Sequence, residues 1–296
     1  MSNYGVDSEN SKIKQLSFER PNEGEVNFIV SAHSGFNHST GFETLNRYFN
    51  HEFLTNNALD LKSKGGRGEA LLGSLPYKTM SLLYGPIKDL ELNEDDRGGG
   101  GGSYGWCLRH YFRGGLISKF IKDGFWRFDK WACRARLEFE LLTELYSLGL
   151  PVPRPLIARE QVGTFLVTND ILVERIDNTN NLAELLEQKA SMDDALIDEI
   201  ANTIAKFAFH KVVHTDLNIR NLLINDKGQC FVIDFDKCFI KDGFTKDDLI
   251  TMLNRLERSF NKEKELCHYD DLDTQVLCER LKNQALLSFE RLGSAK

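Results

Sequence analysis

The chain lacks long apolar runs. No segment of its 296 residues approaches the roughly 18 consecutive apolar residues that a membrane-spanning helix needs. Its first ten residues are polar and acidic instead of basic and then apolar, which argues against a secretory signal. We therefore expect a cytoplasmic globular protein without a transmembrane segment.

The chain also lacks the cysteine patterns of a metal site or a disulfide framework. Its six cysteines form no CxxC pair and no Cys/His spacing typical of zinc. Two of them lie in or beside apolar segments on either side of Asp234. We expect reduced and mostly buried thiols at Cys107, Cys133, Cys230, Cys238, Cys267 and Cys278.

The chain also has no excess of positive charge, because its formal net charge is −7. This charge argues against general nucleic-acid binding. The charge is nevertheless uneven. Between Arg109 and Arg136 the chain has eight Lys or Arg residues against two Asp residues, interleaved with aromatic side chains. Such a segment suits a surface that meets both phosphates and the interfacial layer of a bilayer. A solvated surface whose aromatic rings belong to the core is an equally open interpretation.

The most specific motif lies in the second half of the chain. His214-Thr215-Asp216 is followed by Asn221, five residues after the aspartate, and then by Ile233-Asp234-Phe235-Asp236. This spacing is typical of the catalytic loop and metal-binding aspartate of kinase folds. Asp216 then meets the substrate hydroxyl, and Asn221 and Asp234 hold Mg²⁺. We assign His214 to holding the loop.

Two apolar segments, 222–224 and 230–233, flank the turn 225–228 and predict paired strands between the loop and the metal-binding aspartate. A plain β-hairpin with acidic residues at its ends would explain the strands alone. It would not explain the loop spacing together with a strand that ends in Asp-Phe-Asp.

The pattern of apolar positions predicts an α+β protein with a two-lobed, protein-kinase-like fold. We expect a flexible polar leader over 1–40, a nucleotide-binding lobe over 41–173 with a small antiparallel sheet and one long helix, and a mainly helical catalytic lobe over 174–296. Helical spacing marks four further segments, and Pro151, Pro153 and Pro155 mark a stiff connection into two strands. The expected helices cover 131–148, 181–189, 197–210, 246–260 and 272–289, and the expected strands of the first lobe include 106–111, 156–158 and 164–174.

Two glycine-rich segments compete as the loop that covers nucleotide phosphates. Gly66, Arg67 and Gly68 lie in a turn between two expected strands, where backbone N–H groups can approach a phosphate closely. Five consecutive glycines at 98–102 follow a cluster of carboxylates, which would repel phosphates, so a flexible linker is favoured there. We take the stretch 74–103 as an insertion between strands, and the second loop remains open as an alternative.

Three further residues complete the predicted nucleotide site. Arg109 lies on the expected strand 106–111 and is the candidate phosphate-contacting cation, and Glu138 on the long helix is its candidate partner. Glu174 begins the expected hinge where adenine would bind.

Four strings together resemble the 3-deoxy-D-manno-octulosonic acid (Kdo) kinase family, which belongs with the sugar kinases of the bacterial lipopolysaccharide core. They are Arg109-His110-Tyr111-Phe112-Arg113-Gly114-Gly115, the proline run 152–155, the loop 214–221 and Asp234-Phe235-Asp236-Lys237-Cys238. The resemblance covers roughly residues 42–289. It implies a protein-kinase-like fold, ATP and Mg²⁺, and phosphate transfer to the 4-hydroxyl of a Kdo residue on a lipid A precursor.

The resemblance also assigns roles and a place in the cell. It implies Asp216 as catalytic base, Asn221 and Asp234 as metal ligands, Glu138 as the helix carboxylate, and Gly66-Arg67-Gly68 as part of the nucleotide loop. It further implies a peripheral protein at the cytoplasmic face of the inner membrane, and it leaves the oligomeric state open. Arg109 stands where most kinases have Lys; its planar guanidinium could still contact phosphate with two hydrogen bonds.

Three other functions remain as alternatives. A kinase of a core heptose would use the same catalytic residues. A protein Ser/Thr kinase is disfavoured because no Ala-Pro-Glu string follows Asp234. A nucleotide-binding scaffold without activity has only the Arg in place of Lys in its favour.

Overall fold

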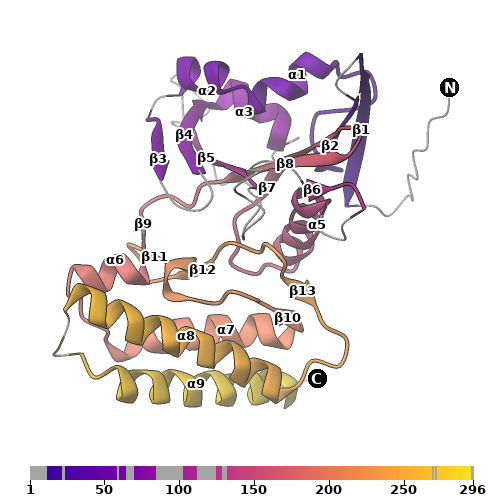
Figure 1. Ribbon diagram of the computed structural model, residues 1–296. Coiled ribbons are helices and arrows are strands. Elements are labelled where there is room, and N and C mark those ends of the chain that lie inside the picture. The colour runs from indigo at the N-terminus through magenta and orange to yellow at the C-terminus, as the bar shows by residue number, and fades with distance from the viewer. Residues whose placement is uncertain are drawn as a thin grey trace. The chain divides into compact units, whose positions relative to one another are not determined.

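The computed structural model describes residues 12–21, 24–58, 60–64, 70–84, 103–111, 125–128, 132–268, 270 and 272–294. The chain folds into two compact units, which Figure 1 shows in ribbon form. The first unit comprises Met1–Glu144 and Arg154–Arg175, and the second comprises Leu145–Pro153 and Ile176–Lys296. The predicted boundary between the lobes follows residue 173. The last boundary between the two units follows Arg175.

The first unit is built on an antiparallel sheet whose central strands come late in the sequence. Its strand order is β1 (Ile13–Arg20), β2 (Gly24–Ser31), β7 (Pro155–Val162), β8 (Leu166–Glu174), β5 (Ser103–His110), β4 (Ala70–Pro76) and β3 (Lys62–Lys64). A short strand, β6 (Phe125–Trp126), also pairs with β8. Because β7 and β8 lie between β2 and β5, the middle of the sheet forms only when strands that are far apart in the sequence pair with each other.

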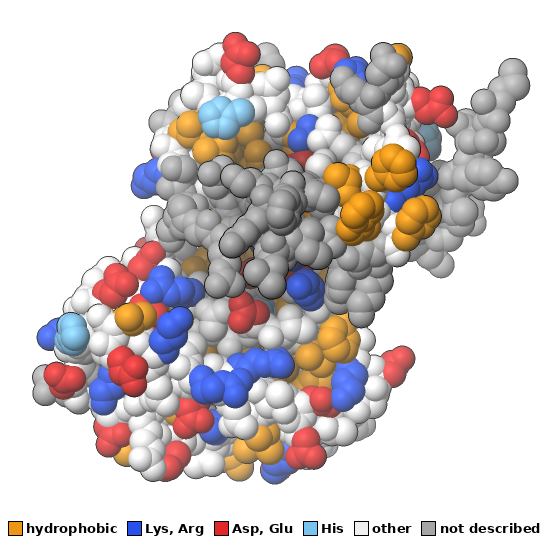
Figure 2. Space-filling view, viewed as in Figure 1, with side chains coloured by type: hydrophobic (Ala, Val, Ile, Leu, Met, Phe, Trp, Pro, Cys, Tyr) orange, Lys and Arg blue, Asp and Glu red, His pale blue; other side chains and the backbone are white. Residues whose placement is uncertain are grey.

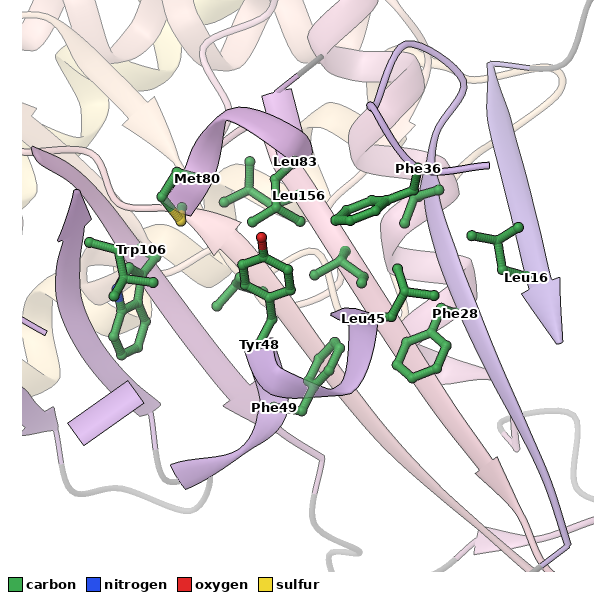
Figure 3. Packing of buried hydrophobic residues seen from close by; sticks show 14 of the residues in the cluster. Leu16, Phe28, Phe36, Leu45, Tyr48, Phe49, Met80, Leu83, Trp106 and Leu156 are labelled. Atoms are coloured by element: carbon green, nitrogen blue, oxygen red, sulfur yellow. The ribbon is translucent and has the colours of Figure 1, made fainter. Parts of the chain in front are cut away.

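Short helices bury the apolar face of this sheet. They are α1 (Phe42–Asn46), η1 (Arg47–Phe49), α2 (His51–Asn57) and α3 (Tyr77–Tyr84). Figure 3 shows the resulting core, in which Leu45, Tyr48 and Met80 from the helical segments lie among Phe28 and Trp106 from the strands. Each of these side chains is fully buried, so the helices are held mainly by packing.

The predicted flexible leader is wrong for residues 13–31, which form β1 and β2. The polar composition of β1 reflects an edge strand, because residues that stay at the surface can be polar without loss of pairing. Its partner β2 carries Val26, Phe28 and Val30 into the core. The ring of Phe18 packs edge-to-face on Phe28, with their centroids 5.9 Å apart.

The structure also adds a helix that the sequence pattern did not predict. The stretch 74–103 was expected to be an insertion between strands, and β4 and β5 do pair at its two ends. Directly after Pro76, however, the chain forms α3, and Met80 and Leu83 of this helix are buried in the core. The five glycines at 98–102 lie outside the described residues.

The second unit is mainly helical. Its helices are α6 (Leu182–Glu187), α7 (Asp194–Phe209), α8 (Lys246–Cys267) and α9 (Thr274–Ser294), and α7 and α8 both pack on α9. Side-chain caps mark three helix starts: Asn181 and Thr245 form capping boxes, and Asp193 accepts from the Leu196 N–H. Two small sheets carry the predicted motif: β9 (Thr179–Asn181), β11 (Leu222–Asn225) and β12 (Cys230–Val232) in one, β10 (Val212–Val213) and β13 (Phe239–Ile240) in the other.

The predicted α+β class is confirmed, with an antiparallel sheet and one long helix, α5 (Arg134–Ser147), before a mainly helical carboxy-terminal part. All six cysteines are thiols outside any disulfide, as expected. Only Cys230 and Cys278 are buried, so the prediction of mostly buried thiols is wrong. Within the described ranges, no helix is both long enough and apolar enough to cross a membrane.

Candidate active site

The loop that carries Asp216 is held by hydrogen bonds to its backbone. The carbonyl oxygen of Asp216 accepts from Asn218 Nδ2 at 3.0 Å and from Asn221 Nδ2 at 2.9 Å. The Asp216 side chain is exposed, and no described residue donates a hydrogen bond to its carboxylate. The loop therefore fixes the position of the aspartate while leaving its carboxylate open to a substrate.

His214 ties this loop to the segment that contains Asp234. Its Nε2 donates to the carbonyl oxygen of Ile233 at 3.1 Å, and its ring packs edge-on to Phe235 at 5.0 Å. Burial lowers the pKa of His214 below its usual value, because the charged ring would lose its hydration, although the Ile233 carbonyl and nearby carboxylates oppose this effect. A neutral, buried ring agrees with the structural role predicted for His214.

Asp234 has a left-handed backbone, with φ of 66°, two residues after the end of β12. For a residue with a side chain this conformation costs about 1–2 kcal/mol, so the surroundings must hold it. The Ile233 N–H donates to the Asn221 carbonyl at 3.0 Å, and Thr215 Oγ1 donates to the Asp236 carbonyl at 3.4 Å. These contacts join the Asp234 segment directly to the loop of Asp216 and Asn221.

Helix α8 supports the same loop from one side. Ser259 Oγ accepts from the backbone N–H of Ile219 at 3.1 Å, and Arg220 Nη2 donates to Glu263 Oε1 at 2.5 Å. Glu263 is buried, whereas Arg220 is largely exposed. Sequence analysis missed this support, since a Ser and a Glu one helical turn apart resemble any other helix surface.

In the first unit, the predicted partnership of Arg109 and Glu138 is formed. Arg109 Nη1 donates to Glu138 Oε1 at 2.7 Å, and the Tyr111 hydroxyl donates to the other oxygen of the same carboxylate. Glu138 is buried, and a buried charge is stable only when paired in this way. Tyr111 belongs to the string 109–115 that resembles the family, but residue spacing alone does not predict its contact with Glu138.

His110, the next residue on β5, belongs to a second cluster, which is centred on the buried Asp170 of β8. Because neighbouring strand residues point to opposite faces, His110 lies away from Arg109 and contacts Asp170 at 2.7 Å. Arg159 donates to the other Asp170 oxygen through Nε and Nη2, at 3.0 and 2.8 Å, and to Asn46. The cluster holds β5, β7 and β8 together behind the Arg109–Glu138 pair.

Asn169 connects β8 to the start of α5. Its Oδ1 accepts from the Ala135 N–H at 3.2 Å, and its Nδ2 donates to the Ala132 carbonyl at 2.8 Å. Asn169 is completely buried, so both hydrogen bonds are shielded from water. They position the helix that carries Glu138.

Glu174 and the turn 66–68 are the other residues that we predict to bind the nucleotide. Glu174 is the last residue of β8, and its backbone N–H donates to the Arg154 carbonyl at 2.8 Å. Gly66, Arg67 and Gly68 lie outside the described residues, although β3 and β4 on either side of them pair as expected. The roles of these residues in binding a nucleotide stay predictions.

The basic segment 109–136 is not a uniform surface of free cations. Arg109 is paired with buried Glu138, and Arg136 Nη2 donates to buried Glu160 at 2.9 Å. The Arg134 guanidinium lies over the rings of Tyr111 and Phe125, whereas Arg127 is exposed. Arg113, Lys119, Lys122 and Lys130 lie outside the described residues. Two of the eight cations in the segment, Arg109 and Arg136, are therefore engaged by buried carboxylates, and the contact of the segment with lipid stays a prediction.

The residues of the Asp216 loop fit a magnesium ion by their chemistry. Mg²⁺ prefers hard oxygen ligands and is usually held by one or two protein side chains together with substrate phosphates. Asp234 and Asn221 offer a carboxylate and an amide oxygen on segments that hydrogen bonds join. Among the described residues, no three His, Cys, Asp or Glu side chains gather into a group that could hold a metal ion by themselves.

Comparison with known proteins agrees with these motifs. Residues 94–278 match the model of the lipopolysaccharide kinase (Kdo/WaaP) family. A protein of Vibrio vulnificus named 3-deoxy-D-manno-octulosonic acid kinase is 42% identical over 183 residues, covering 60% of this chain and 75% of that protein. One of Vibrio cholerae with the same name is 38% identical over 191 residues, covering 64% of this chain and 74% of its own length.

A solved structure described as WaaP in complex with acyl carrier protein is similar with a TM-score of 0.41 and 13% identity, covering 84% of this chain and 95% of that one. The family match extends over more than half of the chain and includes Arg109, Glu138, Asp216, Asn221 and Asp234. The chain therefore belongs to the lipopolysaccharide kinase (Kdo/WaaP) family.

Proposed function

We propose that this protein transfers the γ-phosphate of ATP to the 4-hydroxyl of a Kdo residue on a lipid A precursor, as part of lipopolysaccharide core synthesis. The acceptor follows from its relatives, which are named as Kdo kinases. The observation that carries the reaction is the loop in which two amides hold the backbone of Asp216 and leave its carboxylate exposed.

In this proposal, Asp216 orients the sugar hydroxyl and accepts its proton. The hydroxyl oxygen forms a bond to the γ-phosphorus, the bond to the bridging oxygen breaks, and ADP leaves. A carboxylate is suited to this role because its oxygens can accept a hydrogen bond from a hydroxyl. Asn218 and Asn221 keep the carboxylate in place through the Asp216 carbonyl.

The phosphates need positive charge around them. Asn221 and Asp234 would hold Mg²⁺, and a bound ion supplies neutralisation of the charge on the transferred phosphate. Arg109 would contact the phosphates, with Glu138 and Tyr111 orienting its guanidinium. Gly66, Arg67 and Gly68 would cover the nucleotide, and Glu174 would lie next to adenine.

We also propose where the protein acts. A lipid A precursor is anchored in a membrane, so a kinase that has no membrane-spanning helix in its described part would reach it as a peripheral protein. The proposed location is the cytoplasmic face of the inner membrane, where ATP is present. The net charge of −7 does not favour nucleic acid as a partner.

The test is transfer of labelled γ-phosphate to Kdo-lipid A precursor in detergent micelles. We expect Mg²⁺-dependent labelling by the wild type and, for Asp216→Asn, a loss of about 100- to 10,000-fold, the usual contribution of a general base. Asp226→Asn, an exposed aspartate in the turn between β11 and β12, is the matched control and should retain activity.

Other outcomes would redirect the proposal. Labelling of a heptosylated core acceptor, without labelling of the Kdo acceptor, would show a heptose kinase that uses the same loop. A purified, folded wild type that labels neither acceptor would favour a nucleotide-binding scaffold.

A further inference from the structure

Three large aromatic side chains are exposed at one end of the first unit. Trp126 is 47% exposed, Phe128 is 92% exposed and Phe165 is 66% exposed. They come from two segments that the sheet brings together, because Trp126 pairs with Leu166 and the Arg127 N–H donates to the Phe165 carbonyl at 2.9 Å. We call Trp126, Arg127, Phe128 and Phe165 the aromatic tip.

The backbone explains why these rings face outward. In β6, Phe125 is buried beneath the guanidinium of Arg134, so the next residue, Trp126, points to the opposite face. Phe165 lies within the turn between β7 and β8, which the hydrogen bond from the Gly163 N–H to the Leu166 carbonyl closes. A single exposed aromatic residue is common, whereas exposed aromatic rings on two paired segments mark a candidate interaction surface.

The charge beside the rings narrows the choice of partner. Arg127 is exposed and lies between Trp126 and Phe128 in the chain. Figure 2 shows hydrophobic side chains gathered beside a cationic one over β6. Aromatic rings with an adjacent cation suit the headgroup layer of a bilayer, where rings lie at the interface and Arg meets lipid phosphates.

The size of the tip argues against a protein partner. A stable protein interface buries about 800 Å² on each side, and a fully buried aromatic side chain contributes about 150–250 Å². Three partly exposed rings fall well short of that area, whereas insertion into a bilayer interface has no such minimum.

We propose that the aromatic tip inserts into the interfacial layer of an anionic phospholipid bilayer and holds the kinase at the membrane. The inference rests on the proposed function, because attachment to the bilayer would keep the enzyme beside a lipid-anchored acceptor. It assigns the contact to the tip, including Phe165, which lies outside the basic segment 109–136.

The first experiment measures binding to vesicles of phosphatidylethanolamine and phosphatidylglycerol by cosedimentation. Phe128→Ser combined with Phe165→Ser should weaken binding at least about tenfold, because each ring loses apolar burial in the bilayer. Leu266→Ser combined with Val276→Ser removes two similarly exposed apolar side chains from α8 and α9, and should bind like the wild type. Arg127→Glu should weaken binding to these vesicles and leave binding to neutral phosphatidylcholine vesicles unchanged.

A second measurement separates this inference from the proposed function. For the double Phe variant, the ratio of phosphorylation on vesicles to phosphorylation in micelles should fall at least about tenfold. Unchanged vesicle binding by that variant, or a wild type that does not bind these vesicles, would overturn the tip proposal. The tip proposal would also be overturned if the wild type were a dimer, the double Phe variant were a monomer, and both bound vesicles equally well. Failure of the proposed function would instead appear as absent phosphorylation in micelles, whatever the vesicle result.

Discussion

At the residue scale, two neighbouring side chains on β5 hold two buried carboxylates on opposite faces of the sheet. Arg109 binds Glu138, which lies on the long helix α5, and His110 binds Asp170, which Arg159 also contacts. The alternation of strand residues makes this possible, because adjacent positions cannot share a face. The second carboxylate thus supports the strand that presents Arg109.

Asp170→Asn should destabilise the protein by about 3 kcal/mol at pH 7, because it removes a buried charge that pairs with Arg159. Burial alone would raise the pKa of Asp170, but the His110 hydrogen bond and the Arg159 charge outweigh it and lower the pKa below its usual value. This contribution is therefore complete above the unfolded pKa of about 4 and is lost as the pH falls through the lower folded pKa.

Urea unfolding of wild type and Asp170→Asn, at pH 7 and at steps below pH 4, measures this difference. The gap between the two proteins should narrow as the pH falls, whereas exposed Asp242→Asn should match the wild type throughout. A gap that stays constant at low pH would contradict the assignment to the Asp170 charge.

At the scale of elements, α8 acts as a support for the catalytic loop. Ser259 and Glu263 lie one turn apart on this helix and contact consecutive loop residues, Ile219 through its backbone and Arg220 through its side chain. Leu253, Leu256 and Phe260 bury the helix against the rest of the second unit. The loop is thereby tied to a rigid element as well as to His214 and the Asp234 segment.

Glu263→Gln should lower kcat about tenfold, since it weakens a charge-assisted hydrogen bond worth about 1.5–3 kcal/mol that positions the loop. The KM for ATP should change little, because neither Glu263 nor Arg220 is among the predicted nucleotide contacts. Steady-state kinetics with Kdo-lipid A precursor gives both constants. Glu265→Gln, an exposed position on the same helix, serves as the control, and a change confined to KM would argue against a positioning role.

At the scale of the whole molecule, the first unit depends on a late return of the chain. Strands β7 and β8 belong to the first unit although residues 145–153 before them belong to the second. They occupy the middle of the sheet, between β2 and β5. Without them the sheet would separate into β1–β2 and β3–β4–β5, each with an unprotected edge.

A fragment of residues 1–175 should therefore unfold cooperatively, whereas residues 1–144 alone should not. The longer fragment keeps Leu156, Ile157 and Leu172 in the core, and the shorter one loses them together with the central pairing. Urea unfolding followed by circular dichroism compares the two. If the two fragments gave the same transition, the late strands would not be the decisive part of this unit.

Much of the fold was predictable because its signals are local. The helices α5 to α9 have helical spacing of apolar residues, and α6, α7 and α8 also begin at capping residues. The strands near Asp234 are short apolar segments joined by a turn. Strands β1 and β2 and helix α3 were missed. Polar composition concealed an edge strand, and a helix of eight residues next to a strand has too few turns for a clear period.

The spacing of residues along the chain indicates the reaction class that we propose and the residues on which we expect it to depend. Asp216, Asn221 and Asp234 belong to one short segment, so their spacing is visible along the chain, and the strings around Arg109 and Asp234 indicated the family that the comparison shows. The three-dimensional contacts were needed to show that Arg136 and Arg159 pair with buried carboxylates, that α8 holds the catalytic loop, and that Phe165 lies beside Arg127. These facts depend on contacts between segments far apart in the chain, where register and burial, not composition, decide which side chains meet.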